Sequence, residues 1–517
     1  MNISSITTHL IKKHLFNLSM KIFGISSRSS FLTFVFILLS INTLSAQTKI
    51  DTVGLNRLNG GLKALSLDGG LVHANWGFCL MDPKTGKIVT DFDSERSLMP
   101  ASSMKVVTTI TALNLLGANY TYKTYIQYDG TISADSILNG NLYITGSGDP
   151  SLGSDRIDSA MRFDSLVIVW ASKIKKAGIK KITGNIIADA SAFEDYAVPG
   201  SWNWDDIGQY YGAGPYGLNV YENKYTLYYS STKTTAKIDS IFPQIDGLNV
   251  MNDVIVGGSS DAAFIYGAPD NYSRYVVGTI PASRKQYTVD GSMPDPPLFL
   301  ATELRNALDS IGVEVLKQPT TVYAMQRAMM TINANRKNLF EYTSPPLSEL
   351  IFHTNQKSIN LYAEALLKTI GKEQLKDGSS KAGARAVEAY LLGQGFNLSG
   401  FNQDDGSGLS RLDFITPKQM CNLLLIESKQ ANFPVFKESL PIAGRTGTLK
   451  TIADNTVAEG KIFAKSGSMY KVRSYSGYVT TKSGELLSFC VIVNNYTCSS
   501  AEIREKLEKL MVWMVGL

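Results

Sequence analysis

The chain has 517 residues and a formal net charge of +5, with 50 basic against 45 acidic side chains. Four of the basic residues and none of the acidic ones lie in residues 1–46, so the rest of the chain is close to neutral. This balance excludes the strongly basic surface that is typical of nucleic-acid binding. About 470 residues remain beyond that segment, which is enough for two or three domains with sizeable cores.

Residues 1–46 have the parts of a secretory signal. Basic residues come first, an apolar run follows at 31–41, and small residues end the segment at Ala46. This order predicts a signal peptide that is cleaved after residue 46, from a start at either Met1 or Met20. The apolar run is too short to span a bilayer. We therefore expect an exported, periplasmic protein that has no stable membrane span in its mature form.

Cysteine and histidine are scarce. The four cysteines, Cys79, Cys421, Cys490 and Cys498, lack the spacing of metal ligands. An exported protein can pair them, and all three connectivities stay open. Only two histidines lie outside the predicted signal peptide. This number disfavours a histidine metal centre, and a Ser-His-Asp triad would have to use one of the two. We expect lysine to act as the base, and no metal or organic cofactor.

Two strands and a buried helix are predicted near the start of the mature chain. The runs 74–81 and 87–91 predict strands, and residues 82–86 between them predict a turn. Pro100 then opens an apolar helix that runs to Leu116 and ends at Gly117.

The rest of the chain divides into a β-rich stretch and a helical one. Short β-runs such as 122–128 and 141–145 come first, with helices near 163–177 and 297–311 that precede further β-runs at 179–188 and 319–324. Helices follow at 347–353, 358–370, 382–393 and 417–425, then strands at 461–465, 473–480 and 486–494 and a last helix at 499–515. We predict an α/β protein in which residues 47–118 and 340–517 form one αβα sandwich. Residues 119–339 would be an inserted β-rich region of two nested modules.

Ser102 and Lys105 lie three residues apart at the start of the predicted apolar helix, so they share one face with Cβ atoms about 5–6 Å apart. Burial lowers the pKa of a lysine below its usual value of about 10.4, and an uncharged amine can take the proton of a serine hydroxyl. The positive end of the helix favours the resulting alkoxide. Ser103 is the competing nucleophile, but Val106 rather than a lysine stands three residues after it.

The Ser-x-x-Lys pattern is weak by itself, because it recurs at Ser172, Ser230 and Ser468. Two further motifs strengthen it. Ser358-Ile359-Asn360 opens an amphipathic helix, and Lys465-Ser466-Gly467-Ser468 ends an apolar strand. A second Lys-Ser-Gly at 482–484 lies between two predicted strands, and we interpret it as a hairpin turn.

The order Ser-x-x-Lys, Ser-x-Asn, Lys-Ser/Thr-Gly resembles that of the penicillin-binding proteins and serine β-lactamases. The 256 residues between Ser102 and Ser358 resemble the large insert of the low-molecular-mass class C penicillin-binding proteins, the D-alanyl-D-alanine carboxypeptidase/endopeptidase family (peptidase family S13). Further strings agree along the mature chain, at 148–152, 199–206, 405–411 and 440–450. Two positions depart from the usual motifs, with Ile359 in place of Asp and Ser466 in place of Thr.

The resemblance implies a role for each motif residue. Ser102 would attack the carbonyl of a D-Ala-D-Ala peptide bond and form an acyl-enzyme, and Lys105 would take its proton. Ser358 would relay a proton to the leaving amine while Lys465 holds it electrostatically. Asn360 would orient the substrate amide.

The resemblance also implies a substrate-binding set. Ser466 would bind the terminal carboxylate of the peptide, within the segment that continues through Gly467 and Ser468. The backbone N–H of Ser468 would share the oxyanion with that of the nucleophile. Arg411 and, in the insert, Asp189 are candidates for contacting the rest of the stem peptide. The implied partners are peptidoglycan peptides and β-lactams, and no nucleic acid.

Two alternatives stay open. The first is a β-lactamase-like or esterase acyl hydrolase, and the second is a non-catalytic penicillin-binding cell-wall sensor. No motif clearly supplies the base that fast β-lactam hydrolysis requires, so we expect penicillin to bind covalently and to leave slowly.

Overall fold

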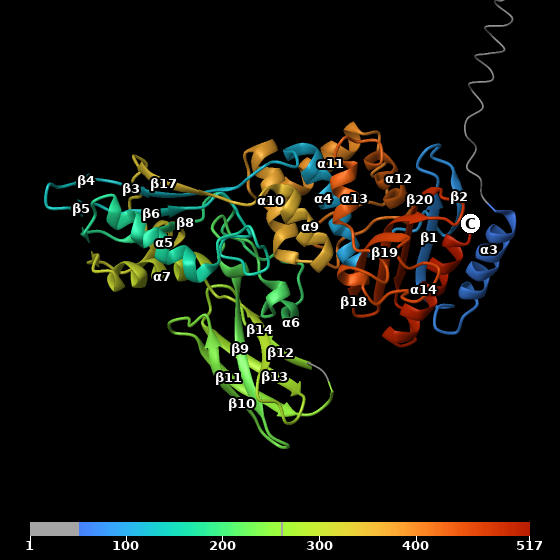
Figure 1. Ribbon diagram of the computed structural model, residues 1–517, viewed down its shortest axis with the longest axis horizontal. Coiled ribbons are helices and arrows are strands. Elements are labelled where there is room, and N and C mark those ends of the chain that lie inside the picture. Colours follow the sequence, from blue (N-terminus) through green and yellow to red (C-terminus); the bar gives the residue numbers. More distant parts are fainter. Residues whose placement is uncertain (1–50, 260–261) are drawn as a thin grey trace, which may run out of the picture. The chain divides into compact units, whose positions relative to one another are not determined.

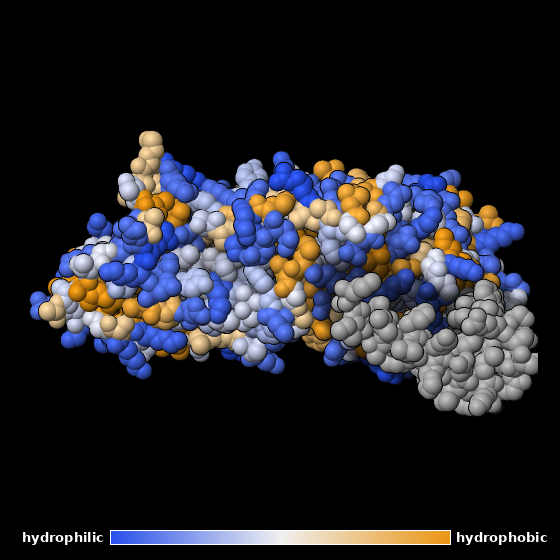
Figure 2. Space-filling model, turned by 90° about the horizontal axis from the view of Figure 1, so that it is seen from above, coloured by the Kyte–Doolittle hydropathy of each residue, from blue (hydrophilic) through white to orange (hydrophobic). Residues whose placement is uncertain are grey.

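The computed structural model describes residues 51–259 and 262–517 (Figure 1). The predicted signal peptide and the two candidate starts lie outside the described residues. Among the helices of the described part, none is long and apolar enough to cross a membrane. On the face seen in Figure 2, hydrophilic side chains are interspersed with small apolar groups.

A five-stranded antiparallel sheet brings the two ends of the described chain together. Its strands, in the order β18-β19-β20-β1-β2, are β18 (Ile462–Met469), β19 (Val472–Thr480), β20 (Leu486–Asn494), β1 (Asn75–Met81) and β2 (Ile88–Phe92). These bounds confirm the predicted strands and the hairpin turn at 482–484. Almost every residue of β19 and β20 is buried, so both faces of this sheet are covered, as an αβα sandwich requires.

Helices from both ends of the sequence cover the sheet. They are α3 (Thr52–Ser66), α4 (Lys105–Leu116), α9 (Leu347–Lys357), α10 (Asn360–Leu375), α11 (Ser380–Gly393), α12 (Pro417–Glu427), α13 (Phe433–Ser439) and α14 (Ser500–Val515). Every residue of α4 from Lys105 to Leu113 is buried, which is typical of a helix at the centre of a core. Its apolar side chains pack with Cys490 and Ile492 of β20 in one cluster.

Helix α3 is absent from the elements predicted above, and the structure explains why this helix forms. Gly60 and Gly61 lie in its middle, and glycine lowers helix propensity by about 1 kcal/mol per residue. A Cβ at Gly61 would overlap the ring of Trp513 in α14. The glycine therefore lets α3 pack closely against the last helix, and tertiary packing outweighs local propensity.

The region between β3 and β17 contains four sheets. A five-stranded sheet has the order β16-β8-β6-β3-β17, a four-stranded sheet β15-β7-β5-β4, and two three-stranded sheets β10-β9-β14 and β11-β13-β12. The last two strands in the order of the first sheet, β3 (Lys123–Tyr128) and β17 (Lys337–Thr343), pair antiparallel. The chain therefore leaves and re-enters the helical part at neighbouring points. The domain boundaries at 118/119 and 339/340 stay predictions that this pairing supports.

The remaining bounds in this region are as follows: β4 (Thr131–Ile132), β5 (Ile137–Asn139), β6 (Leu142–Thr145), α5 (Phe163–Lys176), β7 (Lys181–Ile182), β8 (Ile186–Asp189), α6 (Trp204–Ile207), β9 (Lys224–Ser231), β10 (Ala236–Phe242), β11 (Asn249–Val256), β12 (Ala262–Tyr266), β13 (Ser273–Ile280), β14 (Tyr287–Ser292), α7 (Pro296–Ser310), β15 (Glu314–Val315), β16 (Thr320–Thr321) and α8 (Val322–Arg327). The predicted helices near 163–177 and 297–311 are confirmed. The β-run predicted at 319–324 is wrong beyond Thr321, because the Thr321 hydroxyl accepts a hydrogen bond from the Ala324 N–H and so caps α8.

Candidate active site

The nucleophile motif forms a single 3₁₀ turn, Ala101–Met104, that leads directly into α4. Lys105 Nζ lies 3.0 Å from Ser102 Oγ, so the two side chains share a face, as the spacing predicts. Ala101 has a φ of 48° and is fully buried. An alanine rarely adopts this conformation, and strain of this kind persists where surrounding contacts impose it.

The amine of Lys105 is buried among three oxygen atoms. Besides Ser102 Oγ, these are Asn360 Oδ1 at 2.6 Å and the Ser407 carbonyl oxygen at 2.7 Å. Burial lowers the pKa of Lys105 to about 8, although the Asp405 carboxylate acts in the opposite direction. A neutral amine has two hydrogens, which Asn360 and Ser407 accept, and one lone pair. That lone pair then faces the hydroxyl of Ser102, which is the geometry of a general base.

Ser103, the competing nucleophile, has a different environment. It is fully buried, and its hydroxyl is hydrogen-bonded to that of Ser474 at 2.8 Å. The Ser474 hydroxyl also bonds to the carbonyl of Pro100 at 2.5 Å. Ser103 thus attaches the nucleophile turn to β19, whereas the neighbouring Ser102 is partly accessible.

Ser358 and Lys465 form a second hydroxyl–amine pair. Lys465 Nζ donates to Ser358 Oγ at 2.9 Å and to the carbonyl of Ser466 at 2.7 Å. Ser358 has a left-handed backbone (φ 59°, ψ 41°) between α9 and α10, so the predicted helix begins only at Asn360. Burial, together with the positive charge of Lys105, holds the pKa of Lys465 well below its usual value.

Asn360 connects Lys105 with the inserted region. Its Oδ1 accepts from Lys105, and its Nδ2 donates to the carbonyl of Tyr211 at 2.8 Å. A carboxamide nitrogen carries two hydrogens, so one donor of Asn360 is left after the bond to Tyr211.

The Lys465-Ser466-Gly467-Ser468 segment lies on β18, the first strand of its sheet. β18 is therefore an edge strand, and the outer side of such a strand can pair with an extended peptide. The Ser466 hydroxyl lies 2.8 Å from that of Thr448, and Ser468 is exposed. A Cβ at Gly467 would overlap the Ser474 hydroxyl and the Pro100 carbonyl. Only glycine therefore allows the nucleophile turn to lie against β18.

A buried aspartate organises the loop that supplies the third oxygen near Lys105. Asp405 accepts from the backbone N–H groups of Ser407 (2.9 Å), Gly408 (2.6 Å) and Ser410 (2.7 Å), and from the indole of Trp202 (2.7 Å). In the sequence, residues 405–411 stand out only as part of a family resemblance, and this role of Asp405 is not predicted. The signal for this role is an aspartate followed by small residues with free N–H groups, which is typical of an Asx turn.

Glu364 was also missed, because it reads as part of an amphipathic helix. It lies one turn after Asn360 on α10 and is 1% exposed. Burial, and then the negative charge of Asp405, raises the pKa of Glu364 to about 8. Its charge acts on Lys105, whose pKa it raises.

The two predicted stem-peptide residues differ in their surroundings. Arg411 acts electrostatically on Asp206, whose carboxylate accepts from the hydroxyl of Tyr211 at 3.1 Å. Arg411 therefore lies near the segment that contacts Asn360. Asp189 is buried at the end of β8 and pairs with Arg336 at 2.5 Å. The structure brings Asp189 into no hydrogen bond with the described catalytic candidates, and its role stays a prediction.

None of the three possible cysteine pairings is formed among the described residues, since all four cysteines are free. Cys79 and Cys490 are register partners on β1 and β20. Burial raises the pKa of the Cys490 thiol, so this thiol is poorly reactive.

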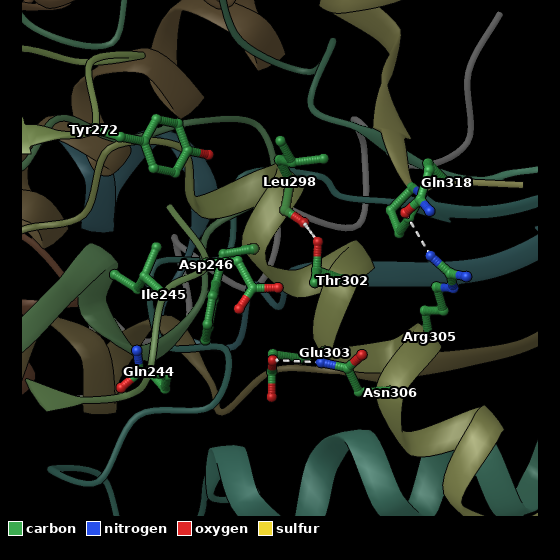
Figure 3. Close-up of a pocket in the computed structure, with 12 residues that line it drawn as sticks. Gln244, Ile245, Asp246, Tyr272, Leu298, Thr302, Glu303, Arg305, Asn306 and Gln318 are labelled. Atoms are coloured by element: carbon green, nitrogen blue, oxygen red, sulfur yellow. Dashed lines mark hydrogen bonds between the residues drawn. The ribbon is translucent and has the colours of Figure 1, made fainter. Parts of the chain in front are cut away.

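A separate cavity lies in the inserted region (Figure 3). Side chains of α7 and of the loop after β10 line it, among them Asp246, Glu303 and Arg305. Glu303 accepts from Asn306 at 3.1 Å and Arg305 donates to Gln318 at 2.5 Å. The lining residues include no hydroxyl–amine pair like those of Ser102 and Ser358.

Comparisons with known proteins agree with this geometry. The model of the D-Ala-D-Ala carboxypeptidase 3 (S13) family matches residues 58–515. The chain is 26% identical to the D-alanyl-D-alanine carboxypeptidase DacB of Haemophilus influenzae, over 85% of this chain and 89% of that one. It is 28% identical to a D-alanyl-D-alanine carboxypeptidase of Actinomadura sp. strain R39, over 86% of this chain and 82% of that one.

The fold is similar to crystal structures of penicillin binding protein 4 (dacB) from H. influenzae. One has a TM-score of 0.73 at 23% identity, and another, complexed with a novel β-lactam, has a TM-score of 0.68 at 22% identity. Each alignment covers 87% of this chain and 97% of the other. The family match spans nearly all of the described residues, and the chain belongs to the D-Ala-D-Ala carboxypeptidase 3 (S13) family.

Proposed function

We propose that this protein is an exported, periplasmic serine D-Ala-D-Ala carboxypeptidase and endopeptidase that cleaves peptidoglycan stem peptides and crosslinks through an acyl-enzyme on Ser102. One observation carries the proposal: the Lys105 amine is buried and 3.0 Å from the Ser102 hydroxyl. The names of the H. influenzae and Actinomadura relatives, both D-alanyl-D-alanine carboxypeptidases, support the same reaction.

In the acylation step, Ser102 Oγ attacks the carbonyl carbon of the penultimate D-alanine while its proton passes to the neutral Lys105 amine. The carbonyl oxygen becomes an oxyanion, which the backbone N–H groups of Ser102 and Ser468 would hold. One such donor contributes roughly 3–4 kcal/mol to the transition state. When the C–N bond breaks, the leaving amine takes a proton from the Ser358 hydroxyl, which Lys105 replenishes.

In the deacylation step, water attacks the ester carbonyl and gives its proton to Lys105. The C–O bond to Ser102 breaks, and Ser102 recovers its proton while the shortened peptide leaves as a carboxylic acid. Atoms and charges balance without a cofactor. The same steps apply when the leaving amine belongs to a neighbouring stem peptide, which is the endopeptidase reaction.

Substrate would lie along the outer side of β18. Ser466 would bind the terminal carboxylate, and the free Asn360 donor would orient the amide. Arg411 would contact the stem peptide farther along the cleft. A β-lactam presents a strained amide at the same position, so penicillin would acylate Ser102 and inhibit the protein covalently.

Two incubations test the proposal, one with fluorescent penicillin and one with a D-Ala-D-Ala-terminated muropeptide followed by mass spectrometry. We expect stable labelling and release of D-alanine, both lost in Ser102→Ala. The matched control is Ser103→Ala, which removes the neighbouring hydroxyl and should keep the label. Labelling with an untouched muropeptide would favour the sensor, and rapid hydrolysis of penicillin would favour the β-lactamase-like alternative.

A further inference from the structure

The small sheet β11-β13-β12 lies in the inserted region (Figure 1), and exposed apolar side chains gather on one of its faces. Its registers place Met251 beside Tyr275 and Tyr275 beside Tyr266, so three side chains from three strands form one row. The next row contains Asp253, Val277 and Phe264. Alternation along the strands puts these residues on the side opposite to the buried Val254, Ile265 and Val276.

Trp204 of α6 extends the first row. Its ring stacks on that of Tyr266 with centroids 6.3 Å apart and an interplanar angle of 29°. Trp204 is 56% exposed, Met251 55% and Tyr275 39%. These four side chains, Trp204, Tyr266, Tyr275 and Met251, define what we call the aromatic face. Apolar groups of this size gathered at one surface mark a binding site more often than chance exposure.

The aromatic face lines a shallow hollow that also includes Asn271 and Ser273. The one cation in its lining, Arg274, is only 1% exposed, and its guanidinium donates to the carbonyls of Asn271 and Ser292. Asp253 at the rim accepts from the hydroxyl of Tyr275 at 2.9 Å. The hollow therefore offers flat rings, uncharged polar groups and one carboxylate.

This chemistry distinguishes among ligands. An anionic lipid surface would need exposed cations, and Asp253 would repel a carboxylate-bearing peptide. A sugar ring presents an apolar C–H face that packs on an aromatic ring and hydroxyls that donate to carboxylate and amide oxygens.

A short chain segment also connects the aromatic face with the catalytic residues. Trp204 begins a short segment that reaches Tyr211, and the Tyr211 carbonyl accepts from Asn360 at 2.8 Å. This inference rests on the proposed function, in which each stem peptide in the cleft is attached to a glycan strand. A polymer that enters the cleft therefore brings sugar rings to its vicinity.

We propose that the aromatic face binds the glycan strand of peptidoglycan through sugar rings stacked on Trp204, Tyr266 and Tyr275. The enzyme would then hold the polymer at one site while it cleaves the peptide at another. Two weak sites joined by one polymer raise the effective concentration of the stem peptide at the nucleophile.

Titration of the full mature chain with a neutral N-acetylglucosamine hexamer, followed by tryptophan fluorescence and calorimetry, tests the proposal. We expect saturable binding with a shift in the emission of Trp204. Tyr275→Ala and Trp204→Ala should each weaken binding about tenfold or more, which is typical when a stacked aromatic is lost. The matched control is Tyr196→Ala, which removes an aromatic side chain that is 72% exposed elsewhere; its affinity should equal that of the wild type. Thermal unfolding of each variant checks that it is folded.

Four outcomes of the titration decide whether the proposal holds. Binding that both variants weaken and the control keeps supports the proposal. The absence of saturable binding overturns the proposal, and so does binding that the folded variants keep. Concentration-dependent self-association also overturns it, if Tyr275→Ala abolishes the self-association and the sugar does not affect it. Penicillin labelling of the wild type is measured in parallel. If labelling succeeds and sugar binding fails, only this inference is wrong. If labelling fails while the hexamer binds, the proposed function is wrong.

Discussion

The pH dependence of acylation follows from the buried position of Lys105. With a pKa of about 8, about one amine in ten is uncharged at pH 7, against about one in 2,500 for a lysine with an unperturbed pKa of about 10.4. This difference corresponds to about 3 kcal/mol of the barrier to proton removal. The acylation rate should therefore rise nearly tenfold per pH unit up to about pH 8 and then level off.

Lys105→Arg tests whether acylation depends on an uncharged amine at this position. It keeps a cation in the site but replaces a titratable amine by a guanidinium that stays charged. Loss of a general base costs roughly 10²–10⁴ in rate, so fluorescent-penicillin acylation measured by stopped flow between pH 5.5 and 9.5 should fall by that factor and lose its pH dependence.

Lys368→Arg is the matched control for this experiment. Lys368 is another fully buried lysine, and it donates to the Tyr196 carbonyl at 2.8 Å. A folded control that acylates normally separates the loss of a base from the cost of burying an arginine. A flat wild-type profile between pH 6 and 9, or rapid acylation by Lys105→Arg, would refute the reasoning.

Three further predictions concern residues around Lys105. Glu364→Gln replaces a carboxyl group whose own pKa is raised to about 8, so this group is mostly uncharged below that pH and the acid limb of the acylation profile should keep its position; a shift of that limb to lower pH would contradict this. Lys105→Met removes an amine whose folded pKa is lower than its unfolded one. The unfolded state therefore binds more protons between about pH 8 and 10.4, and the charged amine lowers the stability of the wild type below this range. Lys105→Met should thus raise the melting temperature most below pH 8 and least above pH 10. Equal increases in melting temperature at both pH values would contradict this prediction. Gly408→Ala places a Cβ against the Ala101 carbonyl at a φ of 81°, so the acylation rate should drop more than tenfold. The matched control is Gly484→Ala, whose Cβ would meet no atom within 4 Å at a φ of 84°. This control should leave the acylation rate unchanged.

Several parts of the fold could be predicted from local patterns. The strands 486–494 and 473–480 and the helix ending at Gly117 have long apolar runs bounded by turn residues, which are strong local signals. The helix α3 could not be predicted, because Gly61 packs against the ring of Trp513, which lies more than 400 residues away in the sequence. The capping of α8 by Thr321 likewise outweighed a local preference for a strand.

The sequence by itself determined the motif order and the spacing of three residues that lets one amine reach one hydroxyl. It could not decide which oxygen atoms surround that amine. Asn360 and Ser407 come within hydrogen-bonding distance of Lys105 only because α10 and the Asp405 loop pack against α4. It is this burial that lowers the pKa of Lys105, since an exposed lysine would stay charged. The tertiary structure alone made a base of Lys105, because desolvation depends on every element that excludes water from the site.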